Sequence, residues 1–115
     1  MKNEVISKDN AMYYQWGEQC DGWHLVDTYD LSIIKERMPP GTREAKHYHQ
    51  TANQFFYILE GEATIELESK TFVLRPSEGL YIKAGQVHAI RNNLDEDLLF
   101  IVTSSPHSHG DRIIV

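Results

Sequence analysis

The sequence has few of the features that mark secreted, membrane-spanning or disulfide-bonded proteins. It contains one cysteine, Cys20, so no disulfide can form within the chain, and a small buried thiol in a reducing compartment is expected. No apolar run approaches the roughly 20 residues that cross a bilayer. The polar residues Lys2, Asn3 and Glu4 interrupt the N-terminal segment, which therefore does not resemble a secretory signal. These absences predict a cytoplasmic protein with no membrane partner.

Positive charge is also scarce. The chain has 11 lysine and arginine residues against 17 aspartate and glutamate residues, and its formal net charge is -6. Because nucleic acids and acidic membranes bind basic patches, this charge predicts no nucleic-acid partner. The sequence also lacks a glycine-rich phosphate loop, a GxSxG motif and a cysteine-centred triad. We therefore expect a small-molecule ligand and no nucleotide or nucleophilic chemistry.

The apolar pattern of the chain is that of short β-strands. Apolar stretches recur at roughly ten-residue spacing and are separated by turn residues, of which Pro39-Pro40-Gly41 is the clearest example. Such spacing predicts an all-β fold, an antiparallel sandwich or barrel. The expected strands lie at residues 31–38, 46–49, 54–59, 63–67, 71–74, 79–82, 87–91 and 98–103.

The length of 115 residues fits one domain, which should bury roughly two-thirds of the surface of the unfolded chain. We expect a single domain over residues 1–115, made of an N-terminal extension or strands (1–30), a core (31–105) and a C-terminal tail (106–115). Residues 1–30 carry little periodicity. Their aromatic side chains are expected on the outside of the barrel or against a second subunit: Tyr13, Tyr14, Trp16 and Trp23.

The most informative stretch holds His47 and His49. In an extended segment alternate side chains share a face, so the two imidazoles point the same way and can clamp a metal ion. The spacing of Gly41, His47, His49, Gln54 and Gly61 resembles the first motif of the cupin superfamily, with Gln54 where that motif usually has glutamate.

A second stretch supports the same resemblance. Gly85, His88 and Asn92 match the spacing of the second cupin motif, whereas Ser77 and Lys83 replace its usual glycine and proline. Two spaced motifs in the right order are far more specific than one. The resemblance implies a double-stranded β-helix or jelly-roll barrel with one divalent metal ion. It implies these ligands: His47, His49, Gln54 and His88.

The replacement of glutamate by Gln54 changes the charge of the expected site. Three neutral histidines and a neutral amide leave a divalent ion at about +2, whereas a carboxylate would leave about +1. The ion should then be a stronger Lewis acid and attract anions. The loss of a charged oxygen disfavours Mn²⁺ and favours Zn²⁺, Ni²⁺, Fe²⁺ or Cu²⁺. A hydrogen-bonding role for Gln54 beside the ligands is the alternative.

Alternation along the following strand places Gln54, Phe56 and Ile58 on one face. Phe56 is then a candidate wall of a substrate pocket, with plain core packing as the alternative. Glu36 is a candidate for binding substrate or carrying a proton, although the face it occupies cannot be fixed from the sequence. His107 and His109 form a second HxH pair in a polar tail, where a surface segment is expected in preference to a second metal site.

Three functions fit these residues. The first is metal-assisted isomerase or lyase chemistry on a sugar-like or keto-acid ligand. Glutamine at this position resembles the small cupins that linearise unsaturated uronates, but the segment 98–105 carries no acid or arginine to move a proton. The second is a dioxygenase with a redox-active metal. The third is a ligand-binding or sensing module without turnover.

We also expect a homodimer. The strand at 54–59 is apolar on both faces, so its outward face needs a cover, either from residues 1–30 or from another chain. Isologous pairing of two copies is the commonest way to provide one.

Overall fold

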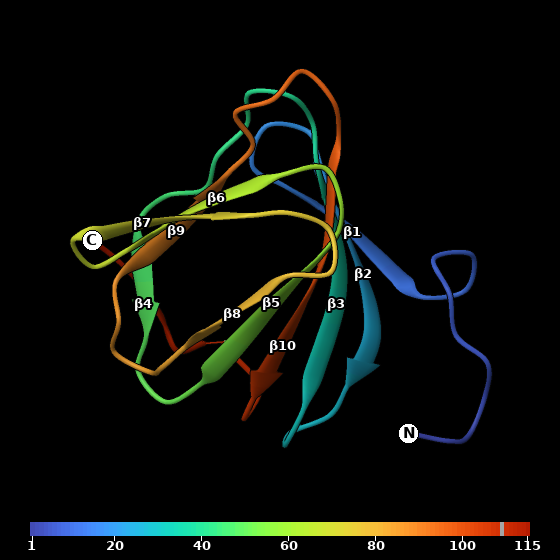
Figure 1. The fold of residues 1–115 in the computed structure, drawn as a ribbon. Coiled ribbons are helices and arrows are strands. Elements are labelled where there is room, and N and C mark those ends of the chain that lie inside the picture. The colour runs from blue at the N-terminus through green and yellow to red at the C-terminus, as the bar shows by residue number, and fades with distance from the viewer. Residues whose placement is uncertain (109) are drawn as a thin grey trace.

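Two antiparallel β-sheets form the fold, seen in a computed structural model that describes residues 1–108 and 110–115 (Figure 1). The six-stranded sheet has the order β1 (Met12–Trp16), β2 (Cys20–Asp27), β3 (Ser32–Met38), β10 (Leu98–Ser105), β5 (Asn53–Glu60) and β8 (Gly79–Ile82). The five-stranded sheet has the order β11 (Arg112–Ile114), β4 (His47–His49), β9 (His88–Arg91), β6 (Ala63–Leu67) and β7 (Lys70–Leu74). The expected all-β class is confirmed.

The core lies between the two sheets. It consists of the inward side chains of both sheets, and the largest fully buried ones include Met38, Ile58, Ile65, Ile90 and Phe100. Ile58 and Phe100 come from strands on which buried and less buried residues alternate, as expected when one face is turned to the core. Ile65 and Ile90 lie on β6 and β9, where three consecutive residues are buried. Among the described residues, no helix is long and apolar enough to span a membrane.

Alternation along β5 follows the predicted face. Gln54, Phe56 and Ile58 are buried, whereas Phe55 is 40% and Tyr57 is 37% exposed. The rings of Phe55 and Tyr57 stack on the outer surface, with their centroids 6.3 Å apart. Nothing in the described chain buries this aromatic face.

The N-terminal residues extend the six-stranded sheet instead of lying over it. Strands β1 and β2 pair with each other, and β2 pairs with β3, so both continue the sheet on the side away from β8 (Figure 1). They do not cover the outer face of β5.

The expected outward packing of the N-terminal aromatic residues is wrong for Tyr14 and Trp16. Both line the interior cavity, whereas Tyr13 and Trp23 contact each other with ring centroids 5.7 Å apart. Tyr14 lies opposite Gly22 in the β1–β2 register, and a Cβ atom added at Gly22 would lie 2.3 Å from the Tyr14 ring. Only glycine leaves room for this ring position.

The C-terminal segment adds a strand to the barrel. Strand β11 pairs with β4 so that Arg112 lies opposite His49 and Ile114 lies opposite His47. The segment expected as a tail therefore supplies one edge of the five-stranded sheet. His107 Nε2 lies 2.5 Å from Asp27 Oδ1. His109 lies outside the described residues, so the second HxH pair is not described as a unit.

Candidate metal centre

Three histidines from two neighbouring strands meet at one point inside the barrel. His47 and His49 project from the same face of β4, and His88 on β9 lies directly opposite His47 in the strand register. They are 3%, 5% and 2% exposed. Their potential ligand atoms all lie within 4.8 Å of one another, so the group can hold a metal ion. The structure therefore brings together the three histidines that the sequence singled out.

Each imidazole is oriented by a hydrogen bond at Nδ1. His47 Nδ1 lies 2.8 Å from the Ala45 carbonyl oxygen, and His88 Nδ1 lies 2.9 Å from the Gln86 carbonyl oxygen. An acceptor at Nδ1 places the proton there and leaves the Nε2 lone pair free to bind a metal. His88 Nε2 is buried and has no hydrogen-bond partner among the described residues. This unpartnered, converging donor set fits a divalent transition metal.

Burial favours the neutral form, the form that ligates metals, for His47 and His88. Burial is the main reason that the pKa of His47 is lowered to about 3; the nearby charges of His88, Arg112 and His49 contribute to the lowering, and a hydrogen bond to Ala45 opposes it. Burial is also the main reason that the pKa of His88 is lowered. Protonation of these rings costs free energy because a charged ring would lose its hydration.

Asp111 on the segment before β11 is the carboxylate that orients His49. Its Oδ1 lies 2.8 Å from His49 Nδ1, and its Oδ2 accepts hydrogen bonds from the Thr51 and Ala52 backbone nitrogens at 3.0 Å and 2.9 Å. Partial burial raises the pKa of Asp111, but the hydrogen bonds from His49, Thr51 and Ala52 outweigh it and the pKa is lowered overall. Asp111 therefore ties the C-terminal segment to the loop that follows His49.

Gln54 enters the same space from the other sheet. Its side-chain Nε2 donates a hydrogen bond to Ser104 Oγ at 3.0 Å, while its Oε1 is buried and has no partner among the described residues. Gln54 is 7% exposed. An unpartnered buried amide oxygen is costly, so the arrangement leaves one oxygen that a cation would satisfy. Direct ligation by Gln54 stays a prediction.

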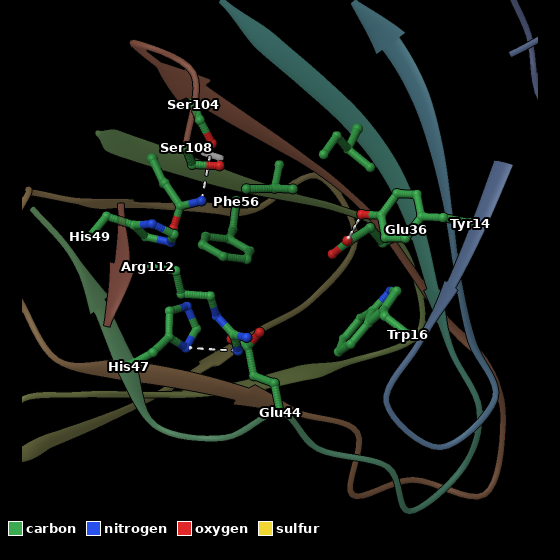
Figure 2. A pocket seen from close by; sticks show the side chains of 13 residues that line it. Tyr14, Trp16, Glu36, Glu44, His47, His49, Phe56, Ser104, Ser108 and Arg112 are labelled. Atoms are coloured by element: carbon green, nitrogen blue, oxygen red, sulfur yellow. Dashed lines mark hydrogen bonds between the residues drawn. The ribbon is translucent and has the colours of Figure 1, made fainter. Parts of the chain in front are cut away.

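A cavity of about 270 Å³ adjoins the histidines, and its wall includes both substrate-site candidates, Glu36 and Phe56. Figure 2 shows His47 and His49 on one side of this cavity and Tyr14, Trp16 and Glu36 on the other. Phe56 is 4% exposed and also belongs to the core cluster, so its ring packs in the core and walls the cavity at once.

Two carboxyl groups in the wall have raised pKa values. Burial raises the pKa of Glu36 to about 7, against a hydrogen bond from the Tyr14 hydroxyl to Glu36 Oε2 at 2.7 Å and the positive charge of Arg112. Burial and the negative charge of Glu36 raise the pKa of Glu44 to about 8, although its Oε1 accepts a hydrogen bond from the Ile90 nitrogen. Burial and the nearby Glu36 also raise the pKa of Tyr14. A carboxyl that titrates near neutral pH can both accept and donate a proton.

Several residues of the site were not predicted from the sequence. Tyr14 and Trp16 alternate along one strand, a spacing of two that could have placed them on a common face. Nothing in the sequence marks Asp111 or the two other missed residues, because they reach the site only through the pairing of β11 and the turn before β4. These two residues are Glu44 and Arg112, which line the cavity.

A buried cluster of three histidines beside a cavity, inside a barrel of two antiparallel sheets, defines a β-barrel protein equipped to bind a metal and a small ligand. Residues 34–110 match the family described as the cupin domain, and the chain belongs to this family. The predicted family is thus confirmed.

Similar proteins include both curated relatives and solved structures. The chain is 38% identical over 69 residues to the polyketide synthase CurC of Streptomyces cyaneus, which covers 60% of this chain and 45% of that protein. It is 32% identical over 59 residues to quercetin 2,3-dioxygenase of Bacillus subtilis, which covers 51% of this chain and 18% of that enzyme. The matches thus span less than half of either relative.

A solved structure of a conserved Klebsiella pneumoniae protein with a double-stranded β-helix domain has a TM-score of 0.81 with this chain. It is 19% identical and covers 99% of this chain and 98% of its own. At this identity the likeness concerns the fold alone, and it confirms the double-stranded β-helix.

Proposed function

We propose that the protein is a metal-dependent enzyme that moves a proton on the carbon next to a carbonyl group of a small sugar-like or keto acid. This is isomerase or lyase chemistry. The observation that carries the proposal is Glu36, a carboxyl with a pKa of about 7 in the wall of the cavity that His47 and His49 also line.

The metal would be held by His47, His49 and His88, with Gln54 as the fourth ligand. All four side chains are neutral, so a transition metal such as Zn²⁺, Ni²⁺, Fe²⁺ or Cu²⁺ is preferred to Mn²⁺. When bound, the ion supplies a Lewis acid that stabilises the negative charge developing on a substrate carbonyl oxygen.

Glu36 is suited to carry the proton. Near neutral pH both of its protonation states are populated, so it can take a proton from one carbon and return it to another atom of the substrate. The hydrogen bond from the Tyr14 hydroxyl fixes the Glu36 carboxyl at the cavity wall. The segment 98–105 carries no acid, but in this proposal the acid that moves the proton is Glu36 on β3.

The size of the cavity favours a small substrate. Its volume of about 270 Å³ leaves room for a small organic molecule. The aromatic rings of Trp16 and Phe56 exclude water from part of the wall, which strengthens electrostatic interactions inside.

A dioxygenase is the second candidate, and the 32% identity to quercetin 2,3-dioxygenase favours it. That chemistry needs a redox-active metal. Elemental analysis of the purified protein, with oxygen uptake measured on the iron-loaded and copper-loaded forms, separates the two candidates. About one zinc per chain and no oxygen uptake would argue for proton transfer. Binding without turnover is the third possibility.

Proton exchange tests the proposal directly. We expect the Zn²⁺-loaded protein to exchange the methyl protons of pyruvate for deuterium in D₂O, followed as loss of the methyl signal in proton NMR. Glu36→Gln should lower the exchange rate by about 100-fold or more, since an amide cannot act as the base.

The rate should rise as the pH passes through about 7, where Glu36 ionises and becomes the base. Glu4→Gln, at an exposed residue far along the chain from the site, is the matched control and should change nothing. Absence of exchange with each of the four candidate metals would refute the proposal.

A further inference from the structure

Among the described residues that line the cavity, Arg112 is the one with a cationic side chain. It reaches the cavity from β11, where its partner across the strand pair is His49. Its Nη2 lies 3.4 Å from His47 Nδ1, beside the imidazole in Figure 2. That nitrogen already faces the Ala45 carbonyl oxygen at 2.8 Å and so carries its own proton. The contact between Arg112 and His47 is therefore a close approach of two donors and satisfies neither.

The guanidinium has no ion-pair partner within residues 1–108 and 110–115. By contrast, Arg37 forms ion pairs with Asp21 and Asp97, and Arg75 forms one with Glu62. Glu36 and Glu44 share the cavity with Arg112, yet neither forms an ion pair with it. A guanidinium offers five donors in a planar fork that matches a carboxylate.

The charges around the cavity favour an anionic occupant. Three histidines and an amide would leave a divalent ion at about +2, and Arg112 adds a further positive charge. Asp111 contributes one negative charge, but its oxygens are engaged by His49, Thr51 and Ala52, and Asp111 is not among the residues that line the cavity. With Glu36 and Glu44 largely protonated below about pH 7, the cavity carries a net positive charge.

We infer that Arg112 is a specificity-determining residue that binds the carboxylate of the substrate, so that the substrate class is a carboxylate-bearing carbonyl compound, a 2-keto acid or a uronate-like acid. The inference rests on the proposed function, which needs a carbonyl group beside the histidines and an acidic carbon within reach of Glu36. Arg112 lies at the histidine side of the cavity and Glu36 at the opposite wall (Figure 2). A bound keto acid would then present its carboxylate to Arg112 and its neighbouring carbons toward Glu36.

The test compares two probes of similar size, pyruvate and hydroxyacetone, of which only pyruvate carries a carboxylate. Each is titrated into the Co²⁺-loaded protein, and binding is followed by the change in the visible absorption of the cobalt. We expect pyruvate to bind more tightly than hydroxyacetone. Arg112→Gln should weaken pyruvate binding by about 10- to 100-fold, the usual worth of a charged hydrogen-bonded pair, and leave hydroxyacetone binding unchanged.

Arg112→Lys keeps the charge but loses the planar fork, so its affinity for pyruvate should be intermediate. Arg75→Gln is the matched control, because Arg75 is exposed on a turn outside the cavity and its loss should alter neither affinity. Circular dichroism and the cobalt content of each variant check that the fold and the metal site are intact. If Arg112→Gln does not fold, the pyruvate affinity of Arg112→Lys relative to the wild type tests the inference.

Two results would overturn the inference. One is equal affinity of the wild-type protein for pyruvate and hydroxyacetone. The other is the same pyruvate affinity in the wild type, Arg112→Gln and Arg112→Lys. The proposed function fails separately. If pyruvate binding depends on Arg112 but its methyl protons do not exchange in D₂O, the carboxylate site stands and the proton-transfer chemistry does not. If the protons exchange without any dependence of pyruvate affinity on Arg112, the reverse holds.

Discussion

At the scale of single residues, the site depends on side chains that leave one polar atom without a partner. His88 Nε2 and Gln54 Oε1 are both buried and unsatisfied among the described residues. They belong to buried side chains from the two facing sheets, His88 on β9 and Gln54 on β5. A cation between them would remove both penalties at once.

The first prediction concerns Gln54. Gln54→Glu should keep metal binding and shift the preference toward Mn²⁺ by about tenfold or more, because a charged oxygen suits a hard cation better than an amide does. Competition titrations with Mn²⁺ and Zn²⁺ on both proteins measure the shift. Ser104→Ala, which removes only the hydrogen bond to the amide, is the control and should alter the preference much less. An unchanged preference in the Glu variant would mean that Gln54 does not touch the metal.

The sequence identified the histidines because strand alternation and motif spacing agree on their positions. It could not fix the face of Glu36, since β3 offered no anchor from which to count. It placed Tyr14 and Trp16 outside for the same reason, and only the pairing of β1 with β2 and β2 with β3 turns them inward.

At the scale of elements, the short strand β11 matters more than its three residues suggest. It pairs with β4, the strand that carries His47 and His49, and it brings Asp111 and Arg112 to the site. Its role was not predicted because the segment is polar, rich in turn residues and without alternation. Strand pairing at long sequence separation, in this case about 60 residues, leaves no local signal.

The second prediction tests this element through Asp111. Asp111→Ala should weaken Zn²⁺ affinity by about 10- to 100-fold, because the carboxylate that orients a ligand histidine is lost. Asp111→Asn should weaken it less, since its amide oxygen can still accept the proton of His49 but its nitrogen cannot accept from Thr51 and Ala52. Competition with a chromophoric chelator measures both affinities.

Asp30→Asn, at an exposed position between β2 and β3, serves as the control for the loss of one negative charge. If Asp111→Ala and Asp111→Asn both bind Zn²⁺ as tightly as the wild type does, Asp111 only fixes the loop after His49 and does not affect metal binding by His49.

At the scale of the whole molecule, the strands of the barrel core were predicted well, whereas the N-terminal strands were not. The strands between residues 31 and 105 fall within a few positions of their expected places, because apolar alternation and turn residues coincide there. Strand β1 has a mixed pattern, since its inward side chains Tyr14 and Trp16 line the cavity, whereas Cys20 at the start of β2 is buried in the core. Alternation of apolar and polar residues does not identify cavity-lining residues well, because tyrosine and tryptophan occur both on cavity walls and on the outer surface.

The third prediction is that two copies pair through the outer face of β5 and β8. Phe55, Tyr57 and Tyr81 are 40%, 37% and 53% exposed there, and the N-terminal strands do not cover them. Light scattering at micromolar concentration should give about twice the chain mass of 13.3 kDa. Phe55→Glu should shift the mass toward that of one chain, because a desolvated carboxylate at an aromatic interface is unfavourable.

Tyr29→Glu is the control, since Tyr29 is 84% exposed in the turn between β2 and β3 and lies off this face. A wild-type mass of one chain would contradict the dimer and leave the aromatic face of β5 open to solvent.

The close approach of Tyr14 to Gly22 has a consequence for comparing relatives of this protein. Gly22 bears no reactive group, yet the absent side chain is what lets the Tyr14 ring lie where its hydroxyl meets Glu36. A relative with every histidine retained would still lose this hydrogen-bonded pair through one added methyl group on the neighbouring strand. A difference in reaction between relatives would then arise from replacement of a glycine, a residue type that a comparison of chemically reactive side chains does not include.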